Sequence, residues 1–285
     1  MEYGIYKAIS DEKYHNNLDD ENTIWFSSHL ASTLYSQTPY HAWMNHPKLN
    51  PNYKPINKKE FDIGTAAHEL MLKKDDNKIC VLEYDNFRTN DSKYDKKISY
   101  ENGIIPILRE DYEKINQMVD TGKEFIELSP IAGIFNNGNP EVTILGNAFG
   151  ADFKSRLDWL TSDMSIIFDY KTSKSANPKK FARDIFNFGY DIQAAAYKEI
   201  SKCNTYIWFV QEIEYPYLCS IIVLDSVTQE IGRNKLKIAC KKWLECLRTK
   251  KWPAYGNNIH EIEPKPWDVE EVEQRLLDEG ENDEI

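Results

Sequence analysis

The stretch IIFDYKTSK, residues 166–174, decides how the fold is interpreted. Bulky apolar residues dominate it, which is typical of a buried strand, yet Asp169 and Lys171 stand two positions apart within it. Because side chains alternate between the two faces of a strand, both charges lie on one face, whereas Ile166, Phe168 and Tyr170 lie on the other. The stretch therefore predicts a buried strand that carries two charged side chains on one face.

The preceding segment, GADFKSRLDWL at residues 150–160, shows the same alternation and places Arg156 and Asp158 on one face. TSDM, residues 161–164, predicts a turn that joins the two strands as a hairpin. If residues 161 and 164 flank the turn, Arg156 lies opposite Asp169, and Asp158 lies one diagonal step away. Cross-strand and diagonal neighbours are roughly 5–8 Å apart, so we expect the charges to converge.

Two carboxylates at that separation repel each other unless a cation lies between them. Mg²⁺ is bound in proteins by one or two carboxylates and keeps several waters or substrate phosphates, so Asp158 and Asp169 predict a magnesium site. Lys171, a compact positive charge, can then orient a water that attacks phosphorus. The residues alone leave open an alternative, a structural Arg–Asp–Lys ion-pair cluster on a solvated sheet face.

The length and composition allow one large globular domain or two small ones. The chain has 285 residues, of which 41% are hydrophobic and 13% aromatic, enough for a full core. Its five cysteines are scattered with no CxxC pair, which disfavours a zinc ribbon or a disulfide framework. No apolar run approaches the ~18 residues of a membrane span, and the first residues lack a signal-peptide layout. We expect a cytoplasmic protein without a membrane partner.

The net charge of −11 is unevenly spread. Residues 261–285 hold 11 acidic and 2 basic side chains, whereas residues 154–183 hold seven basic and three acidic ones. We therefore divide the chain into a domain at 1–260 and an acidic tail at 261–285. A locally positive body suits a polyanion, although a solvated charged surface is the alternative. The basic residues expected to contact a nucleic-acid backbone are Lys174, Lys179, Lys180 and Arg183.

The order of predicted elements indicates the fold class. Helices are expected at 23–35, within YHAWMNHP, at 59–74, in 110–135, at 178–187, 190–202 and 226–249, strands at 141–149, 150–160, 165–171, 205–213 and 218–224, and an irregular lysine-rich loop at 79–106. This order predicts an α/β (α+β) fold with a central mixed sheet flanked by helices: helices come first, then a β-meander, helices, two strands and a last helix.

The spacing of the acids resembles a known superfamily. Asp158, followed eleven residues later by DYK at 169–171, resembles the PD-(D/E)xK nucleases, in which an acid, a hairpin and an acid-x-lysine follow one another. Leu157 stands where the superfamily name has proline. D-x-K alone is weak evidence because it arises by chance in many chains.

Two further motifs resemble the RecB-like branch of that superfamily. DIQAAAY at 191–197 matches its Q-x-x-x-Y signature, with Gln193 and Tyr197 on one helical face. GTAAHELM at 64–71 matches its helix histidine, here His68. A buried core histidine and a polar pair on an amphipathic helix are the alternatives for these motifs.

Within the branch, residues 23–250 resemble the RecE (exonuclease VIII) group, most specifically in the stretch 154–197. The resemblance implies Mg²⁺-dependent 5′→3′ degradation of linear double-stranded DNA to mononucleotides, which leaves a 3′ single strand for recombination. It also implies a ring-shaped homo-oligomer in a bacterial or phage setting and a RecT-like single-strand annealing protein as partner.

The resemblance also implies residue roles. Asp158 and Asp169, with the backbone carbonyl of Tyr170, would be metal ligands, and Lys171 would activate or position the water. His68 would be a further ligand. Because neutral imidazole suits Mn²⁺ better than Mg²⁺, we expect Mn²⁺ to substitute. Gln193 and Tyr197 would hold the DNA backbone or the water network of the site.

Other residues have two interpretations each. Glu141 is either a further acid of the site or a strand-end surface charge. Arg156 either binds a phosphate or pairs with Asp169 when no metal is bound. Ser27 and Ser28 are helix caps that could also form a terminal 5′-phosphate pocket, because helix N-termini bind phosphate.

Two rival functions stay open on the sequence. One is a structure-specific endonuclease on the same fold, and the other is a catalytically silent DNA-binding subunit. The acidic tail is a solvated helix, a docking element for a partner, or a guard against DNA outside the site.

Overall fold

The computed structural model describes residues 1–16, 18, 23–54, 62–73 and 77–280. Contacts divide the chain into two units, Met1–Trp252 and Pro253–Ile285. The boundary expected after residue 260 lies eight residues beyond this division. The chemistry-bearing residues belong to the first unit.

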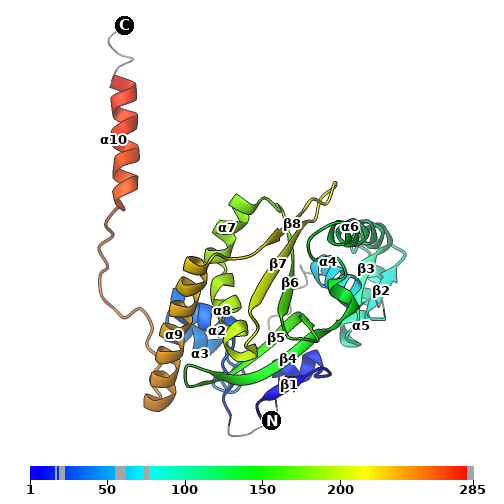
Figure 1. The fold of residues 1–285 in the computed structure, drawn as a ribbon, viewed down its shortest axis with the longest axis horizontal. Coiled ribbons are helices and arrows are strands. Elements are labelled where there is room, and N and C mark those ends of the chain that lie inside the picture. The colour runs from blue at the N-terminus through cyan, green and yellow to red at the C-terminus, as the bar shows by residue number, and fades with distance from the viewer. Residues whose placement is uncertain (17, 19–22, 55–61, 74–76, 281–285) are drawn as a thin grey trace. The chain divides into compact units, whose positions relative to one another are not determined.

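The described residues form a six-stranded sheet in the order β1-β4-β5-β6-β7-β8 (Figure 1). Its strands are β1 Gly4–Tyr6, β4 Gly138–Ala148, β5 Ala151–Thr161, β6 Ile166–Ser173, β7 Thr205–Glu212 and β8 Cys219–Ile222. β6 and β7 run parallel, whereas the other neighbours are antiparallel. The predicted class, a mixed sheet flanked by helices, is confirmed.

One face of the sheet is covered by helices from both ends of the first unit (Figure 1). These are α2 Ser28–Ser36, α3 Pro39–Met44, α7 Pro178–Asn187, α8 Tyr190–Ser201 and α9 Ser226–Thr249. Their apolar sides meet the strands in a continuous core that contains Phe26, Phe153, Trp208 and Trp243. The predicted helices and strands of residues 141–249 are thus found in place.

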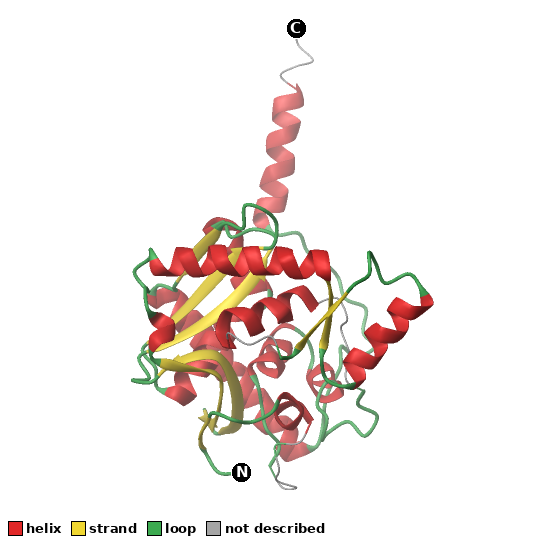
Figure 2. Ribbon diagram, turned by 90° about the vertical axis from the view of Figure 1, so that its right-hand side faces the viewer, coloured by secondary structure: helices red, strands yellow, loops and turns green. Residues whose placement is uncertain are grey.

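The opposite face has two covers. Over β6 and β7 lie α4 Asp62–His68, a π-helical turn Glu69–Lys73 and the long helix α6 Arg109–Glu127, which crosses the strands in Figure 2. Over β4 and β5 lies the N-terminal segment with α1 Asp11–Asn16, which buries Tyr14 against Leu145. The helix predicted at 59–74 corresponds to α4 and the π-helical turn, and its residues 59–61 and 74 lie outside the described residues.

Residues 79–106 are not the irregular loop that the sequence predicts. Parallel strands β2 Ile79–Leu82 and β3 Ile105–Leu108 enclose helix α5 Asn90–Glu101. The strands are only four residues long, and the helix has no wide apolar stripe, so hydrophobic periodicity misses all three. Thr89 caps the start of α5, because its hydroxyl accepts the Ser92 N–H at 3.2 Å. Threonine is a typical capping residue, so this helix start could have been predicted from the sequence.

The unit Pro253–Ile285 contains helix α10 Pro266–Gly280, whose described side chains are exposed. Among the described residues, no helix has the length and apolar character needed to cross a membrane.

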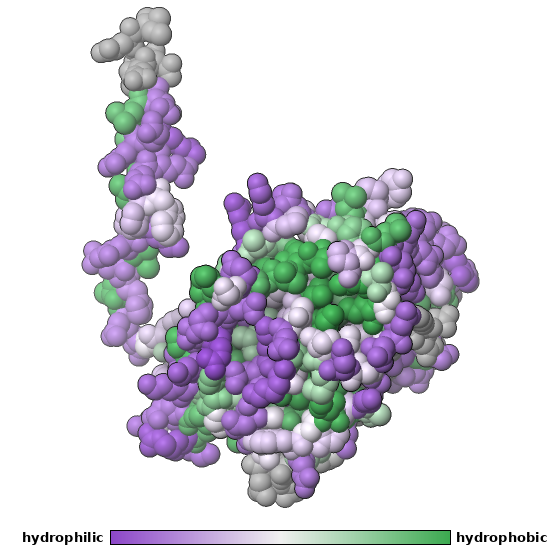
Figure 3. Space-filling view, viewed as in Figure 1, coloured by the Kyte–Doolittle hydropathy of each residue, from purple (hydrophilic) through white to green (hydrophobic). Residues whose placement is uncertain are grey.

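The free edge of the sheet carries apolar surface. β8 is the edge strand, and Leu218 and Val223 beside it are exposed. Figure 3 shows hydrophobic side chains gathered over this part of the molecule.

Candidate active site

The hairpin between β5 and β6 has a different register from the one predicted. The described strands pair at Trp159–Phe168 and Leu160–Ile167, which places a longer turn between them. Its ends are tied because the Thr161 hydroxyl accepts the Ile166 N–H at 3.0 Å. The expected pairing of Arg156 with Asp169 is therefore wrong. A side-chain-stabilised turn replaced the tight turn assumed from the sequence.

Beyond those two pairs, the described parts of β5 and β6 separate and form a fork. The Tyr170 N–H donates to the Asp158 carboxylate at 2.9 Å instead of to a β5 carbonyl. Farther along β5, Phe26 takes the place of β6 and pairs in parallel with Phe153. The fork therefore opens a polar gap in the sheet, and helix α2 begins directly after the segment that closes it.

Asp169 forms the buried side of this gap, with 2% of its side chain exposed. One carboxylate oxygen forms an ion pair with Lys171, and the other accepts the Tyr206 hydroxyl at 2.5 Å. Burial disfavours the charged form of Lys171, but the carboxylates of Asp169 and Asp158 outweigh burial and raise its pKa. Burial and Asp169 raise the pKa of Tyr206 well above its usual range, so this phenol stays protonated and donates.

Asp158 lies on the more open side and meets His68 from α4. The Nδ1 atom of His68 is 3.5 Å from Asp158 Oδ2, and its ring centroid is 4.9 Å from that of Tyr170. α4 ends at His68 and continues as a π-helical turn, a feature often found at functional sites. Desolvation and the charge of Asp169 raise the pKa of Asp158, although His68 and Lys171 oppose the rise.

Helix α8 supplies a polar wall to the gap. Burial and the charge of Asp169 raise the pKa of the Tyr197 phenol, and the neighbouring side chains of Gln193 and Ser28 oppose the rise. Ser27 caps α2, since its hydroxyl accepts the Leu30 N–H at 3.5 Å. The structure thus brings Ser28, Gln193 and Tyr197 to the acids, and it gives Ser27 its cap.

Arg156 and Glu141 pair with each other. Arg156 donates to Glu141 Oε2 at 2.7 Å and to the Ile9 carbonyl at 3.0 Å. The proposed pairing of Arg156 with Asp169 in the absence of metal is wrong, because Lys171 takes that carboxylate. Glu141 lies on β4 beside Asp158, between two residues that pair with β5.

The predicted backbone-binding residues lie outside the fork. Lys174, Lys179, Lys180 and Arg183 are exposed on α7 and on the loop that precedes it. Asn177 caps this helix and accepts the Lys179 N–H at 2.9 Å. The structure leaves these four side chains available to a polyanion, but it does not bring them to the acids.

Sequence reasoning missed two tyrosines of the site. Tyr206 reaches Asp169 because β7 runs parallel to β6, with Tyr206 beside Ile167, and this pairing leaves no local trace in the sequence. Tyr190 places its ring centroid 5.1 Å from Lys171 Nζ. Its position three residues before Gln193, on the same helix, was a signal that could have identified it.

The acidic and histidine side chains of the fork have the donor chemistry of a metal site but not its geometry. In the described part of the chain, no three His, Cys, Asp or Glu side chains converge as a preformed site. Asp169 is instead turned to Lys171 and Tyr206. The donor chemistry nevertheless fits a hard divalent cation, because two carboxylates lie close enough for Asp169 to raise the pKa of Asp158, and His68 adjoins them.

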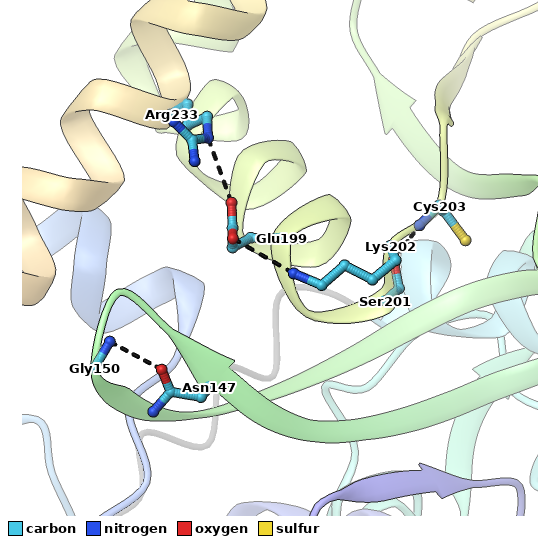
Figure 4. Close-up of polar contacts among 7 residues, drawn as sticks. All are labelled: Asn147, Gly150, Glu199, Ser201, Lys202, Cys203 and Arg233. Atoms are coloured by element: carbon cyan, nitrogen blue, oxygen red, sulfur yellow. Dashed lines mark hydrogen bonds and ion pairs between the residues drawn. The ribbon is translucent and has the colours of Figure 1, made fainter.

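A separate cavity of about 650 Å³ lies between α8, β7 and α9. Glu199 pairs with Lys202 and Arg233 at its rim (Figure 4). Tyr206 lines it, but Asp158, Asp169, Lys171 and His68 do not. Its size suits a small molecule, but two of its acids are already paired, Glu199 with Lys202 and Arg233 and Asp191 with Lys235. The fork, not this cavity, is the candidate active site.

Comparison with known proteins agrees with this assignment of the fold. The chain belongs to the family described as PDDEXK-like domain of unknown function (DUF3799), whose model matches residues 35–264. The fold and the fork thus define a member of the PD-(D/E)xK nuclease superfamily. No curated protein matches the chain.

Several solved structures are similar to the chain, among them the following two. A crystal structure titled "Putative exonuclease" from Eubacterium rectale has a TM-score of 0.60 at 14% identity, and the match covers 92% of this chain and 98% of that one. A phage related exonuclease from Haemophilus somnus 129PT has a TM-score of 0.32 at 13% identity, with coverage of 48% and 72%. At 14% identity, the similarity to the Eubacterium rectale structure shows that the two chains share a fold.

Proposed function

We propose that this protein is a metal-dependent nuclease that hydrolyses phosphodiester bonds of DNA. One observation carries the proposal: Asp158, Asp169 and Lys171 meet in the fork between β5 and β6, where a sheet would ordinarily bury apolar side chains. A buried ion pair contributes little to stability, so charges at this position are better explained by chemistry.

Asp158 and Asp169 would hold a divalent cation, Mg²⁺ or Mn²⁺, and His68 would complete the ligand set. When bound, such a cation neutralises phosphate charge and lowers the pKa of a nearby water. To take part, Asp169 must share the oxygen that now pairs with Lys171 or the one that accepts Tyr206. The predicted contribution of the Tyr170 carbonyl stays a proposal.

The chain's own residues supply the rest of the reaction. Water attacks phosphorus in line, a new P–O bond forms, and the bond to the leaving 3′ oxygen breaks, so the product carries a 5′-phosphate. The Lys171 ammonium, about a fifth exposed, faces the gap and can hold the attacking water or a non-bridging oxygen. Gln193 and Tyr197 orient the water or the DNA backbone from α8.

We further propose the finer activity that the resemblance to the RecE group implies. The enzyme would degrade linear double-stranded DNA 5′→3′ as a ring-shaped homo-oligomer and work with a RecT-like single-strand annealing protein. Ser27 and Ser28 at the start of α2 would contact a phosphate, and the exposed cations of α7 would hold the backbone. Sedimentation velocity would test the oligomer, with a single monomeric species as the contradicting result.

The activity is tested on three substrates with Mg²⁺: linear duplex labelled at either 5′ end, covalently closed circular duplex, and single-stranded DNA. Wild type is compared with Asp169→Asn, and Asp163→Asn in the same hairpin is the matched control. We expect loss of linear duplex alone, progressive from the 5′ ends, with wild type and the control but not with Asp169→Asn. Cut circles would favour the endonuclease, and equal behaviour of all three proteins would contradict the proposed site.

A further inference from the structure

A second, half-buried lysine lies on the same strand as Asp158. Lys154 is on β5 and donates to the Tyr14 carbonyl at 2.7 Å, with its ammonium 4.7 Å from the centroid of the Tyr14 ring. In the described part of the chain, no carboxylate pairs with it. A desolvated ammonium without an anion is costly, and this cost calls for a physical explanation.

Two more segments complete the surroundings of Lys154. Phe26 pairs in parallel with Phe153, so the preceding Trp25 projects to the same side of the sheet as Lys154. The Trp25 indole is 4% exposed, and its N–H has no hydrogen-bond partner among the described residues. Lys48, in the segment that follows α3, also lies near Lys154, and its positive charge lowers the pKa of Lys154.

His46 holds this arrangement together without adding charge. Burial, together with the charges of Lys154 and Lys48, lowers the pKa of His46 to about 4. Its Nδ1 accepts the backbone N–H of Lys48 at 3.1 Å, so Nε2 carries the proton and donates to the Trp25 carbonyl at 3.1 Å. The imidazole is therefore a neutral brace between the two segments.

The side chains of Trp25, Lys48 and Lys154 line a recess of about 20 Å³. A space of that size holds about one water molecule, and an anionic oxygen is of similar size. The recess therefore has room for one oxygen of a larger anion but not for a whole small molecule. It offers only donors from these three residues: two ammonium groups and an indole N–H.

We propose that Lys154, Lys48 and Trp25 form a binding site for a phosphate group, which places one non-bridging oxygen in the recess. Lys154 is four residues from Asp158 on one strand, about 13 Å at the usual rise per residue. The phosphate source that this position favours is the DNA cleaved in the fork, and in that respect the inference rests on the proposed function. A free phosphate is the other source of the same chemistry.

The test measures binding of duplex DNA in EDTA, by fluorescence anisotropy at several KCl concentrations, so that catalysis plays no part. Lys154→Met removes the charge and keeps the length of the side chain. Lys237→Met, on the exposed side of α9, is the matched control. Each phosphate contact adds about 0.9 to the slope of log K against log salt, so Lys154→Met should lower the slope by about 0.9. Lys237→Met should leave it unchanged.

Trp25→Phe separates the hydrogen bond from the charge. It removes the indole N–H and keeps an aromatic ring, so we expect binding several-fold weaker with an unchanged salt slope. This variant also keeps the test decisive if Lys154→Met does not fold, which circular dichroism would reveal.

A second arm identifies the source of the phosphate by following thermal unfolding with added inorganic phosphate. If phosphate stabilises wild type but not Lys154→Met, while the DNA slopes agree, the site takes free phosphate. If neither arm distinguishes Lys154→Met from Lys237→Met, the proposal is overturned. A changed slope together with an inactive wild-type protein would retain the site and refute the proposed nuclease.

Discussion

Lys171 and Lys154 are both largely removed from water, on neighbouring strands of one sheet, and yet their ionisation is driven in opposite directions. Burial disfavours the charge of each. For Lys171, the carboxylates of Asp169 and Asp158 outweigh burial and raise the pKa. For Lys154, burial and the neighbouring Lys48 act together and lower the pKa to about 8.

The difference teaches that the partner, rather than burial, decides what a buried lysine is prepared to do. Lys171 has its counter-ions in place before any substrate arrives and belongs to a reaction centre that a cation can complete. Lys154 has a neutral carbonyl and a tyrosine ring beside it and no carboxylate in the described part of the chain, so an incoming anion would be its first counter-ion. The predictions below test this contrast.

The largest effect is expected from Lys171→Met. Because the ammonium is aimed at the gap beside Asp169, its loss should lower the single-turnover cleavage rate by on the order of 10²–10³-fold, as loss of a transition-state donor does. Lys154→Met should instead raise the DNA concentration needed for half-maximal rate. If Lys171→Met and Lys154→Met lose maximal rate equally, compared with Lys237→Met as the control, the two lysines do not have different roles.

The next effect concerns the metal ion that the acids beside Lys171 would hold. His68→Ala removes the imidazole 3.5 Å from Asp158, and we expect a 10–100-fold weaker metal affinity, which is about the usual effect of changing a supporting residue. The ratio of the cleavage rate with Mn²⁺ to that with Mg²⁺ should be lower for this variant than for wild type. Titrating each metal while following the cleavage rate measures this ratio. An unaltered metal profile, matching that of His260→Ala, would remove His68 from the ligands.

Tyr206→Phe weakens the partner of Lys171 without touching any charge. It deprives Asp169 of a donor at 2.5 Å, which should cost about 1–3 kcal/mol in urea unfolding. Cleavage should fall by about tenfold, because the carboxylate loses one of the contacts that orient it. Tyr215→Phe, at an exposed tyrosine, is the control. No change in either quantity would mean that Tyr206 does not position Asp169.

The smallest effect is the pH dependence of stability that Lys154 contributes. Its folded-state pKa of about 8 lies below the ordinary value of 10.5, so between these pH values the unfolded chain binds more protons. Folding stability should therefore rise with pH in this window, by about 1 kcal/mol per unit. Urea unfolding of wild type minus Lys154→Met, in phosphate-free buffer, measures it. A flat difference would contradict the desolvated state of Lys154.

The sequence predicted much of the β5–β6–α8 region because its signals are local. Alternation placed charges on the strands, and helical spacing joined Gln193 to Tyr197. The predicted register of the β5–β6 hairpin is wrong, because the turn is longer than assumed. The shifted register separates Arg156 from Asp169. The fork itself depends on Phe26 replacing β6 beside β5, a long-range pairing with no local pattern.

The remaining parts of the site depend on tertiary contacts of the same kind. Tyr206 became a partner of Asp169 through the parallel pairing of β6 and β7, and Lys154 became buried through segments distant from it in sequence. Residues 79–106 were missed for another reason, since a polar helix between two four-residue strands carries almost no periodicity. Short elements stabilised by their neighbours are those that hydrophobic patterning cannot predict.

The most direct measurement of the central claim is an anomalous difference map from crystals grown with Mn²⁺. A peak at about 2.0–2.2 Å from carboxylate oxygens of both Asp158 and Asp169, with Lys171 beside it, is the predicted result. A map in which the two carboxylates keep their contacts with Tyr170, Lys171 and Tyr206, and the manganese binds elsewhere or not at all, would contradict the account.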